Sequence, residues 1–457
     1  MKNGVTYISD SRESLPIAWE LLKSGVPVDY YVHDKTYAHN FDGMMPKIGL
    51  GDLPAALRRN DNVIFDITLP IHPPIKPHDL AFLKLFGIKH RTSGLFGAVA
   101  DKLMKDHRVQ GSSSWTEHIE LDREAGFALA KKLGFGIPEY QKFRGLKAGV
   151  KFLQSNEGNK ERWVFKMLNN GPLDLSYPET YSGEVVDLML TSLPQRLVKE
   201  KFNPEAIQYI LQKFVDGVEC SNELSWNGND FANANRTIED KKLAAGNCGP
   251  ATGSQSNVVA LCYDLDGPAF KELQGLKPYL KKSGYIGPID ANVIFEGEKP
   301  WFLEWTPRQG WSSEYCKCAF IPKGQLSNYY LNGYQAVFKD GYVASQLVSL
   351  YPYPELNKQK LEMMIKGNLI NHRLQDLEDM WLQDVYLDEN KKLRCSGSDG
   401  IIGIVTKLGD TPEDAINSVC KSVKNLKISG NLQHRCNDHL EKATARINKL
   451  RQVGIEF

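Results

Sequence analysis

The sequence contains no long apolar run and no excess of charge of either sign. None of its apolar runs approaches the roughly 18 residues that a membrane-spanning helix needs. The N-terminal stretch MKNGVTYISDSRES lacks the long apolar core of a secretory signal. The 457 residues include 56 basic and 55 acidic side chains, for a formal net charge of +1, whereas nucleic-acid binders usually carry a basic excess. We therefore expect a cytoplasmic protein without a membrane partner, and the charge argues against nucleic acid as a partner unless a local basic patch binds it.

Signatures of several common protein classes are also missing. None of the eight cysteines belongs to a C-x-x-C pair, and CKC at 316–318 has no accompanying histidine cluster, so we expect reduced thiols and no zinc site. No G-x-G-x-x-G follows the first apolar strand, which argues against a dinucleotide-dependent enzyme. No G-x-S-x-G surrounds the serines at 112–114, which argues against a serine nucleophile.

The apolar pattern predicts a protein of mixed α/β and α+β domains. The length alone predicts two to four domains. Over about the first 110 residues, strands alternate with helices, which favours a parallel α/β domain. Its expected elements are GVTYISD, a helix over 11–23, VPVDYYVHD, NVIFDITLP, and a helix and strand in DLAFLKLFGIKH.

The middle of the chain is rich in strands, and the last part returns to an α/β pattern. In AIQYILQKFVDGVECSNELSWNGNDF, the DG and NG pairs predict tight turns between strands. After the strand GIIGIVTKL, a helix is expected with Thr411 as its N-cap and Pro412 at its first position.

Two carboxylates stand on otherwise apolar strands in PIDANVIFEGEKPWFLEWTPR, residues 288–308. Asp290 begins the first strand and Glu304 lies near the end of the second. Two acids on neighbouring strands suit magnesium, which prefers oxygen ligands and usually takes one or two carboxylates plus substrate phosphates. An isolated acid on a strand is more often solvated surface, and spacing alone leaves both readings open.

Four further motifs follow one another along the chain: SRESLPIAW at 11–19, GNCGPATG at 246–253, YVASQLVSLYPYP from 342, and GDTPEDAINSVCKSV at 409–423. Their order resembles the ATP-grasp ligases, and among them most closely the phosphoribosylamine–glycine ligases of purine synthesis. The resemblance covers nearly the whole chain. It implies an acceptor-binding α/β domain over 1–112, an ATP-grasp core over 113–345 with a mobile lid at about 140–212, and a C-terminal domain over 346–457.

The resemblance also implies a chemistry. A carboxylate attacks the γ-phosphate of ATP to give an acyl phosphate, and an amine then displaces phosphate to form an amide. Magnesium or manganese and cationic side chains neutralise charge in such a reaction. The small molecules expected to bind are therefore ATP, an amino acid such as glycine, and an amine on a nucleotide or a related molecule. The resemblance allows a monomer or a homodimer.

Carried onto this sequence, the ATP-grasp pattern implies a set of nucleotide and metal residues. Asp290, Glu304 and Thr306 take the metal positions, with Thr306 where the family has asparagine. Lys166 and Arg123 would reach the ATP phosphates, and Arg308 would contact phosphate or carboxylate. The hinge strand that reads adenine matches Gln212, Lys213, Phe214 and Val215, and the acid near the ribose matches Glu219.

The substrate positions match the family less well. By resemblance they are Ser11, Arg12, Glu13, Gly249, Pro250, Thr252, Gly253 and Arg308. The family's glycines before this arginine are replaced by Asp10 and Ser11, and glycines there let the backbone approach a phosphate. Asn247 and Cys248 replace an Asp-Thr pair, and MLNNGPLDLSY replaces a loop of small residues.

These departures favour an ATP-dependent carboxylate–amine ligase whose acceptor site is altered. Two alternatives stay open: the unaltered phosphoribosylamine–glycine ligase reaction, and a catalytically silent protein that binds ATP.

Overall fold

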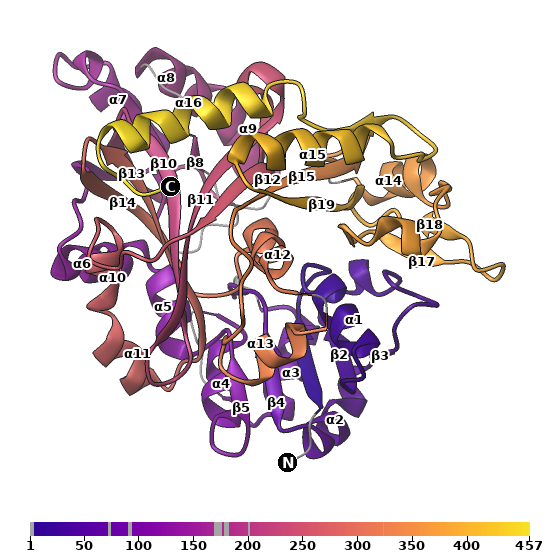
Figure 1. Ribbon diagram of the computed structural model, residues 1–457. Coiled ribbons are helices and arrows are strands. Elements are labelled where there is room, and N and C mark those ends of the chain that lie inside the picture. Colours follow the sequence, from indigo (N-terminus) through magenta and orange to yellow (C-terminus); the bar gives the residue numbers. More distant parts are fainter. Residues whose placement is uncertain are drawn as a thin grey trace.

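The computed structural model describes residues 4–71, 75–89, 94–168, 176–177, 182–199, 202–322, 324–355 and 357–457 (Figure 1). The loop at 169–171, in which we noted a changed sequence, lies outside these residues. Among the described residues, no helix is both long and apolar enough to cross a membrane.

The N-terminal part is a parallel five-stranded sheet with helices, as predicted. The strand order is β3-β2-β1-β4-β5, with β1 (Val5–Ser9), β2 (Val28–Val32), β3 (Lys47–Ile48), β4 (Asn62–Phe65) and β5 (Arg108–Gln110). The helices are α1 (Leu15–Lys23), α2 (Leu53–Arg59), α3 (Pro77–Leu85) and α4 (Gly97–Leu103). Because β1 and β4 are neighbours and the strand order reverses there, the residues after each strand meet at one edge, where α/β proteins bind ligands.

Two details of this part differ from the sequence prediction. Helix α1 begins at Leu15 and not at 11, because the Ser11 hydroxyl accepts a hydrogen bond from the Glu13 amide and closes a turn there. Residues 86–89 form no strand, and the last strand of the sheet is instead β5, whose three residues are too few to show a strand pattern.

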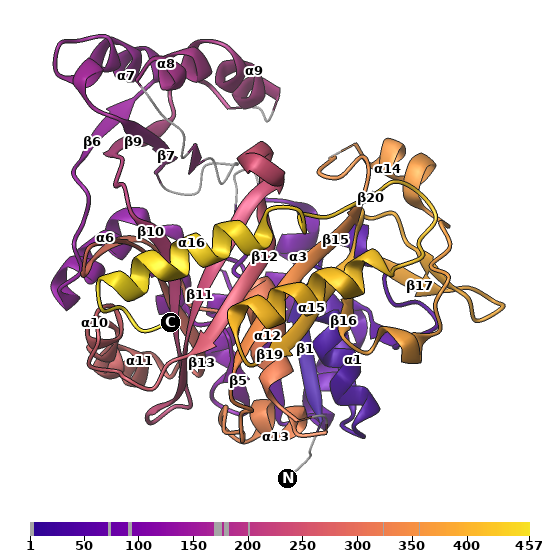
Figure 2. The ribbon, with the colours of Figure 1, turned by 45° about the horizontal axis from the view of Figure 1, so that its top comes forward.

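The lid, residues 140–212, has its own antiparallel sheet and its own core. The strand order is β6-β9-β7-β8, with β6 (Tyr140–Arg144), β7 (Trp163–Met167), β8 (Ser176–Tyr177) and β9 (Gln208–Lys213). Helices α7 (Leu146–Leu153), α8 (Ser182–Leu190) and α9 (Ser192–Lys199) cover it, and Figure 2 shows this unit projecting from the rest of the molecule. All its core residues fall between Leu146 and Leu211.

A nine-stranded antiparallel sheet forms the centre of the molecule. Its order is β14-β13-β10-β11-β12-β15-β19-β16, and β20 pairs with β15. The strands are β10 (Val218–Trp226), β11 (Phe231–Ala244), β12 (Cys248–Leu261), β13 (Gly287–Glu296), β14 (Lys299–Thr306), β15 (Tyr342–Leu350), β16 (Met380–Leu382), β19 (Ile401–Gly409) and β20 (Leu432–Gln433). The domain boundary that we proposed between 345 and 346 falls inside β15, which bonds to both β12 and β19. We keep a domain division between 345 and 346 as a proposal.

The remaining helices surround this sheet, and α15 and α16 lie side by side over one face of it (Figure 1). They are α5 (Ser114–Leu121), α6 (Arg123–Leu133), α10 (Phe270–Gln274), α11 (Lys277–Ser283), α12 (Trp311–Phe320), α13 (Leu326–Leu331), α14 (Lys358–Ile365), α15 (Pro412–Lys424) and α16 (His439–Gln452), with the hairpin β17 (Val385–Leu387) and β18 (Leu393–Cys395) beyond. The predicted start of α15 is confirmed, because the Thr411 side chain accepts from the Asp414 amide at 3.1 Å.

The DG pair at 216–217 does not close a hairpin. The strands on either side of it, β9 and β10, belong to different sheets, so this turn carries the chain out of the lid. The NG pair at 227–228 does lie between paired strands, β10 and β11.

Candidate active site

Polar side chains share one face of the central sheet. On β13, Ile289, Ala291 and Val293 are fully buried in the core, so the alternating Asp290 and Asn292 point to the other face. Asp290 lies directly opposite Thr306 on β14, and Asn292 lies directly opposite Glu304. The hairpin therefore presents four oxygen-bearing side chains in two cross-strand pairs.

The metal positions predicted from the sequence are brought together, but Asp290 is not the partner of Glu304. Asp290 is buried and accepts a hydrogen bond from the Asn222 amide at 2.9 Å. Burial, with Glu223 nearby, raises the pKa of Asp290 well above its usual range. Asn292, which we did not single out, faces Glu304 and offers an amide oxygen. Its place two residues after Asp290 on a strand was the signal for it.

Glu304 is the charged centre of this group. Burial alone would raise its pKa, but Lys241, Arg123, Lys166 and Arg308 together hold the pKa of Glu304 below its usual range. Glu304 is therefore ionised at neutral pH. One carboxylate with neutral oxygens beside it fits a magnesium ion whose other ligands are phosphate oxygens and water.

Lys166 is a buried cation at the end of β7. Its side chain is 7% exposed, and its ammonium forms no ion pair with any carboxylate among the described residues. Burial, together with the positive charge of Arg123, lowers the pKa of Lys166 to about 8, while Glu304 and Glu219 oppose that shift. A buried ammonium without an anionic partner is a ready binding group for phosphate.

The other cations around Glu304 are held in place by neighbouring groups. Arg123, at the start of α6, donates from Nε to the Met167 carbonyl of the lid at 3.1 Å. Arg308 binds Glu120 at 2.9 Å. Lys241 on β11, another residue that the sequence did not reveal to us, bonds to Glu219 at 2.8 Å. Glu219, our expected ribose acid, thus lies in the same charged group.

The hinge residues lie where the lid joins the central sheet, and part of their backbone is already used. The Lys213 amide donates to the Glu139 carbonyl at 2.8 Å, and the Phe214 amide donates to the Arg162 carbonyl at 2.9 Å. The Lys213 side chain pairs with Glu139 at the surface. Gln212 is buried, and its side-chain nitrogen has no hydrogen-bond partner within the described ranges.

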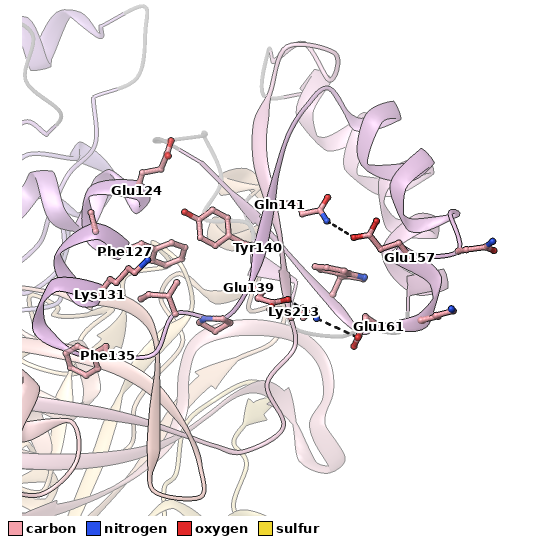
Figure 3. Close-up of a pocket in the computed structure, with 16 residues that line it drawn as sticks. Glu124, Phe127, Lys131, Phe135, Glu139, Tyr140, Gln141, Glu157, Glu161 and Lys213 are labelled. Atoms are coloured by element: carbon pink, nitrogen blue, oxygen red, sulfur yellow. Dashed lines mark hydrogen bonds and ion pairs between the residues drawn. The ribbon is translucent and has the colours of Figure 1, made fainter.

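A pocket of about 1120 Å³ opens beside this hinge (Figure 3). Phe127 and Phe135 from the α6 side and Trp163 from the lid contribute apolar surface, and charged residues such as Lys131 and Glu157 surround it. Trp163 and Lys166 lie three residues apart on β7 and so point to opposite faces of that strand. Of the expected ATP residues, only Lys213 lines this pocket.

The predicted substrate residues of the N-terminal part are engaged in internal contacts. Ser11 is buried in its turn, and the Tyr315 hydroxyl donates to the Glu13 carbonyl. Arg12 is buried and forms an ion pair with Asp399 at 2.7 Å. Its guanidinium also lies over the ring of Trp311, 5.9 Å from the ring centre. One terminal nitrogen of Arg12 is thus in an ion pair, whereas its buried Nε has no hydrogen-bond partner within the described residues.

The predicted substrate residues at 249–253 lie partly in solvent and partly in internal contacts. Gly249 and Pro250 are exposed at the tip of the β11–β12 hairpin. Thr252 donates to the Lys241 carbonyl at 2.8 Å. A Cβ at Gly253 would lie 2.8 Å from the Trp311 ring, so only glycine fits there. Since Trp311 also contacts Arg12, the hairpin, α12 and the β1–α1 turn meet at this tryptophan.

Comparisons by sequence find no relative. No protein-family model matches the chain, and no curated protein matches it.

Solved structures do match, over nearly the whole length. Phosphoribosylamine–glycine ligase from Thermotoga maritima has a TM-score of 0.65 at 15% identity, over 94% of this chain and 99% of that one. Biotin carboxylase from Campylobacter jejuni has 0.59 at 10%, over 98% and 96%. The biotin carboxylase domain of 2-oxoglutarate carboxylase from Hydrogenobacter thermophilus has 0.57 at 11%, over 100% and 99%. The chain therefore has the ATP-grasp fold that the order of its motifs predicted.

Proposed function

We propose that the protein is an ATP-dependent ligase that joins a carboxylate to an amine through an acyl phosphate. ATP would bind between the lid and the polar face of the central sheet, with adenine at Gln212 to Val215 and the ribose near Glu219. The similar structures from Campylobacter jejuni and Hydrogenobacter thermophilus are complexes with adenine nucleotides, the second with magnesium, which supports this choice of ligand.

The observation that carries the proposal is the charge at Lys166. Among the residues that the structure describes, this buried ammonium forms no ion pair with a carboxylate, and it lies near Arg123 in a group that also includes Lys241 and Arg308. Positive charge held in a buried site stabilises the transferring phosphoryl group, whose charge grows on its outer oxygens. Arg308, whose charge interacts with that of Glu13 in the N-terminal part, would orient the carboxylate.

Asp290, Glu304 and Thr306 would hold magnesium, with the amide oxygen of Asn292 as a further donor opposite Glu304. When bound, the ion would bridge phosphate oxygens and neutralise part of their charge. The proposed substrates are an amino acid such as glycine and an amine. We keep 1–112 as the acceptor-binding part, 113–345 as the ATP-grasp core and 346–457 as the C-terminal part.

A second candidate is a silent protein that binds ATP without turning it over. One observation favours it: Glu304 lies directly opposite the neutral Asn292, and Asp290 lies opposite the neutral Thr306, so the two carboxylates do not face each other across the hairpin.

One assay separates the two candidates. ADP release is measured with ATP, magnesium and hydroxylamine, across the amino acids and a few other carboxylates, and hydroxamate is measured in parallel. Because hydroxylamine traps an acyl phosphate, the natural amine is not needed. A ligase gives ADP and hydroxamate with one acid or a few. ATP binding without either product, across the panel, would favour the silent candidate.

A further inference from the structure

Two histidines and one aspartate meet at the carboxyl end of β2, in the N-terminal sheet. His33 follows β2 directly, and its amide donates to the carbonyl of Ser9, the last residue of β1, at 2.7 Å. His78 and Asp79 lie in the first turn of α3. The sheet and the helix therefore bring together three side chains from two distant segments of the chain.

The nitrogen and oxygen atoms of these side chains are close enough to share one metal ion. Asp79 Oδ1 lies 2.8 Å from His33 Nε2 and 3.1 Å from His78 Nε2. One candidate ligand atom of each residue lies within 4.8 Å of the other two. Ligand atoms around a tetrahedral zinc ion are about 3.3 Å apart, since zinc–nitrogen and zinc–oxygen distances are about 2.0–2.2 Å. Small side-chain movements would therefore admit the ion.

The ring of His33 is held in an orientation that suits metal binding. The Tyr31 hydroxyl lies 3.0 Å from His33 Nδ1 and can accept a hydrogen bond from it. A histidine that donates from Nδ1 presents the lone pair of Nε2, and metal-binding histidines are usually held in this way. The rings of Phe82 and Phe96 pack edge-on against His33, with ring centres 5.3 and 6.2 Å away. These contacts favour the ring position in which Nε2 faces Asp79.

The three side chains differ in their access to solvent. The side chain of His33 is 1% exposed, that of Asp79 is 13% exposed and that of His78 is 47% exposed. An ion could therefore enter past His78. Because three ligands leave one position of a tetrahedral zinc ion free, a water molecule could occupy the fourth.

Acidic side chains near this position favour a cation. Burial and the charges of Asp34 and Asp79 raise the pKa of Asp10 to about 7, and the charge of Lys76 opposes that shift. These four side chains together carry a net negative charge whether or not Asp10 is protonated. Their combined field therefore attracts a cation, even with Lys76 among them.

We propose that His33, His78 and Asp79 bind a zinc ion whose fourth ligand is water. Two imidazole nitrogens and one carboxylate are a known zinc ligand set, whereas magnesium prefers oxygen ligands. The site is separate from the magnesium position at Glu304 and does not depend on the proposed ligase function. It contains no cysteine, so the cysteine pattern of the sequence could not indicate it.

Zinc titration of the metal-free protein tests the proposal. The protein is treated with a chelator, dialysed and titrated with zinc in excess magnesium, which occupies sites built from oxygen ligands. Bound zinc is measured by calorimetry and by elemental mass spectrometry, and we expect one ion per chain. If the wild-type protein binds no zinc, the proposal is wrong.

X-ray absorption at the zinc edge identifies the ligands. We expect nitrogen and oxygen neighbours at about 2.0–2.2 Å and the scattering of imidazole rings. A spectrum dominated by sulfur at about 2.3 Å would mean that cysteines hold the ion, and it would overturn the proposal.

Variants locate the zinc. His78→Ala removes a ligand at the exposed side of the site, so the zinc affinity should fall by about 100-fold or more, and Asp79→Asn should lower it by about tenfold or more. His39→Ala is the matched control, because His39 is exposed and also lies 3.0 Å from an aspartate, Asp42. It should change the affinity by less than about twofold. Circular dichroism verifies each fold, and an unchanged affinity in either folded site variant would overturn the proposal.

Discussion

The Glu304 carboxylate interacts with four cationic side chains. Four cations hold its pKa down against the effect of burial. In return, its charge is one of the influences that keep Lys166 protonated. Glu304 is therefore expected to bind magnesium and to support the charge of a phosphate-binding lysine.

Glu304→Gln should lower ADP release by about 100-fold or more, because it removes that charge without changing the side chain's size. The measurement is the steady-state rate in the hydroxylamine assay, with circular dichroism to verify the fold. Glu298→Gln, in the exposed turn of the same hairpin, is the matched control. An unchanged rate in the Glu304 variant would reject the metal assignment.

The lowered pKa of Lys166 predicts that kcat/KM for ATP depends on pH. Its pKa is lowered to about 8, so the ammonium is present below pH 8 and is lost as the pH rises through that value. The value of kcat/KM for ATP, which reports the free enzyme, should therefore fall above about pH 8. Arginine stays charged over this range, so Lys166→Arg should remove this decline wherever activity survives. The same decline in the variant would show that another group titrates.

At the scale of single residues, the sequence predicts which residues belong to the candidate site better than it predicts which of them face each other across two strands. The order of motifs was enough to find Glu304, Lys166 and Arg123, which the structure brings into one charged group. The exact cross-strand partner depends on register, and a bulge between Asn292 and Val293 sets that register. No pattern in the sequence reveals a bulge, so the pairing of Asn292 with Glu304 could not be predicted, although the place of Asn292 on the same face as Asp290 could.

Helix α12 is tied to the central sheet by a buried ion cluster. Lys317 is fully buried and contacts Glu223 on β10 and Glu314 one turn earlier on its own helix. Burial alone would lower the pKa of Lys317, but the two glutamates raise it well above its usual value. Helix α12 also carries Trp311, whose ring lies near the Arg12 guanidinium, so this cluster helps to fix the position of that tryptophan.

Lys317→Met should lower the free energy of unfolding by about 3–5 kcal/mol, since it leaves two buried carboxylates without their cation. Urea denaturation followed by fluorescence measures the change. Lys407→Met, which removes a partly exposed pair with Asp379, should cost about 1 kcal/mol or less. Equal effects of the two variants would contradict the buried role of Lys317.

Whether a segment forms a helix or a strand could be predicted where its apolar pattern was long. Which strands pair with each other could not be predicted. The hairpin of β13 and β14 and the start of α15 followed from alternation and capping residues. The DG turn did not close a hairpin, because turn residues show where a chain bends and not which strands then pair. Likewise, nothing in the pattern of β15 showed that it would join the two halves of the central sheet.

The whole molecule combines a continuous central sheet with a lid that has a separate core. The lid leaves the rest through the segment before β6 and returns after β9, and Arg123 bonds to its Met167 carbonyl. The proposed nucleotide site lies between these two bodies.

The central claim is that a carboxylate oxygen attacks ATP. Oxygen transfer tests it most directly: the carboxylate that supports hydroxamate formation is supplied with ¹⁸O in its carboxyl group, and the released phosphate is analysed by mass spectrometry. The account predicts one ¹⁸O in each phosphate released with hydroxamate, because the attacking oxygen leaves with the phosphoryl group. Phosphate without the label, formed at the same rate, would mean that water attacks ATP and would contradict the account.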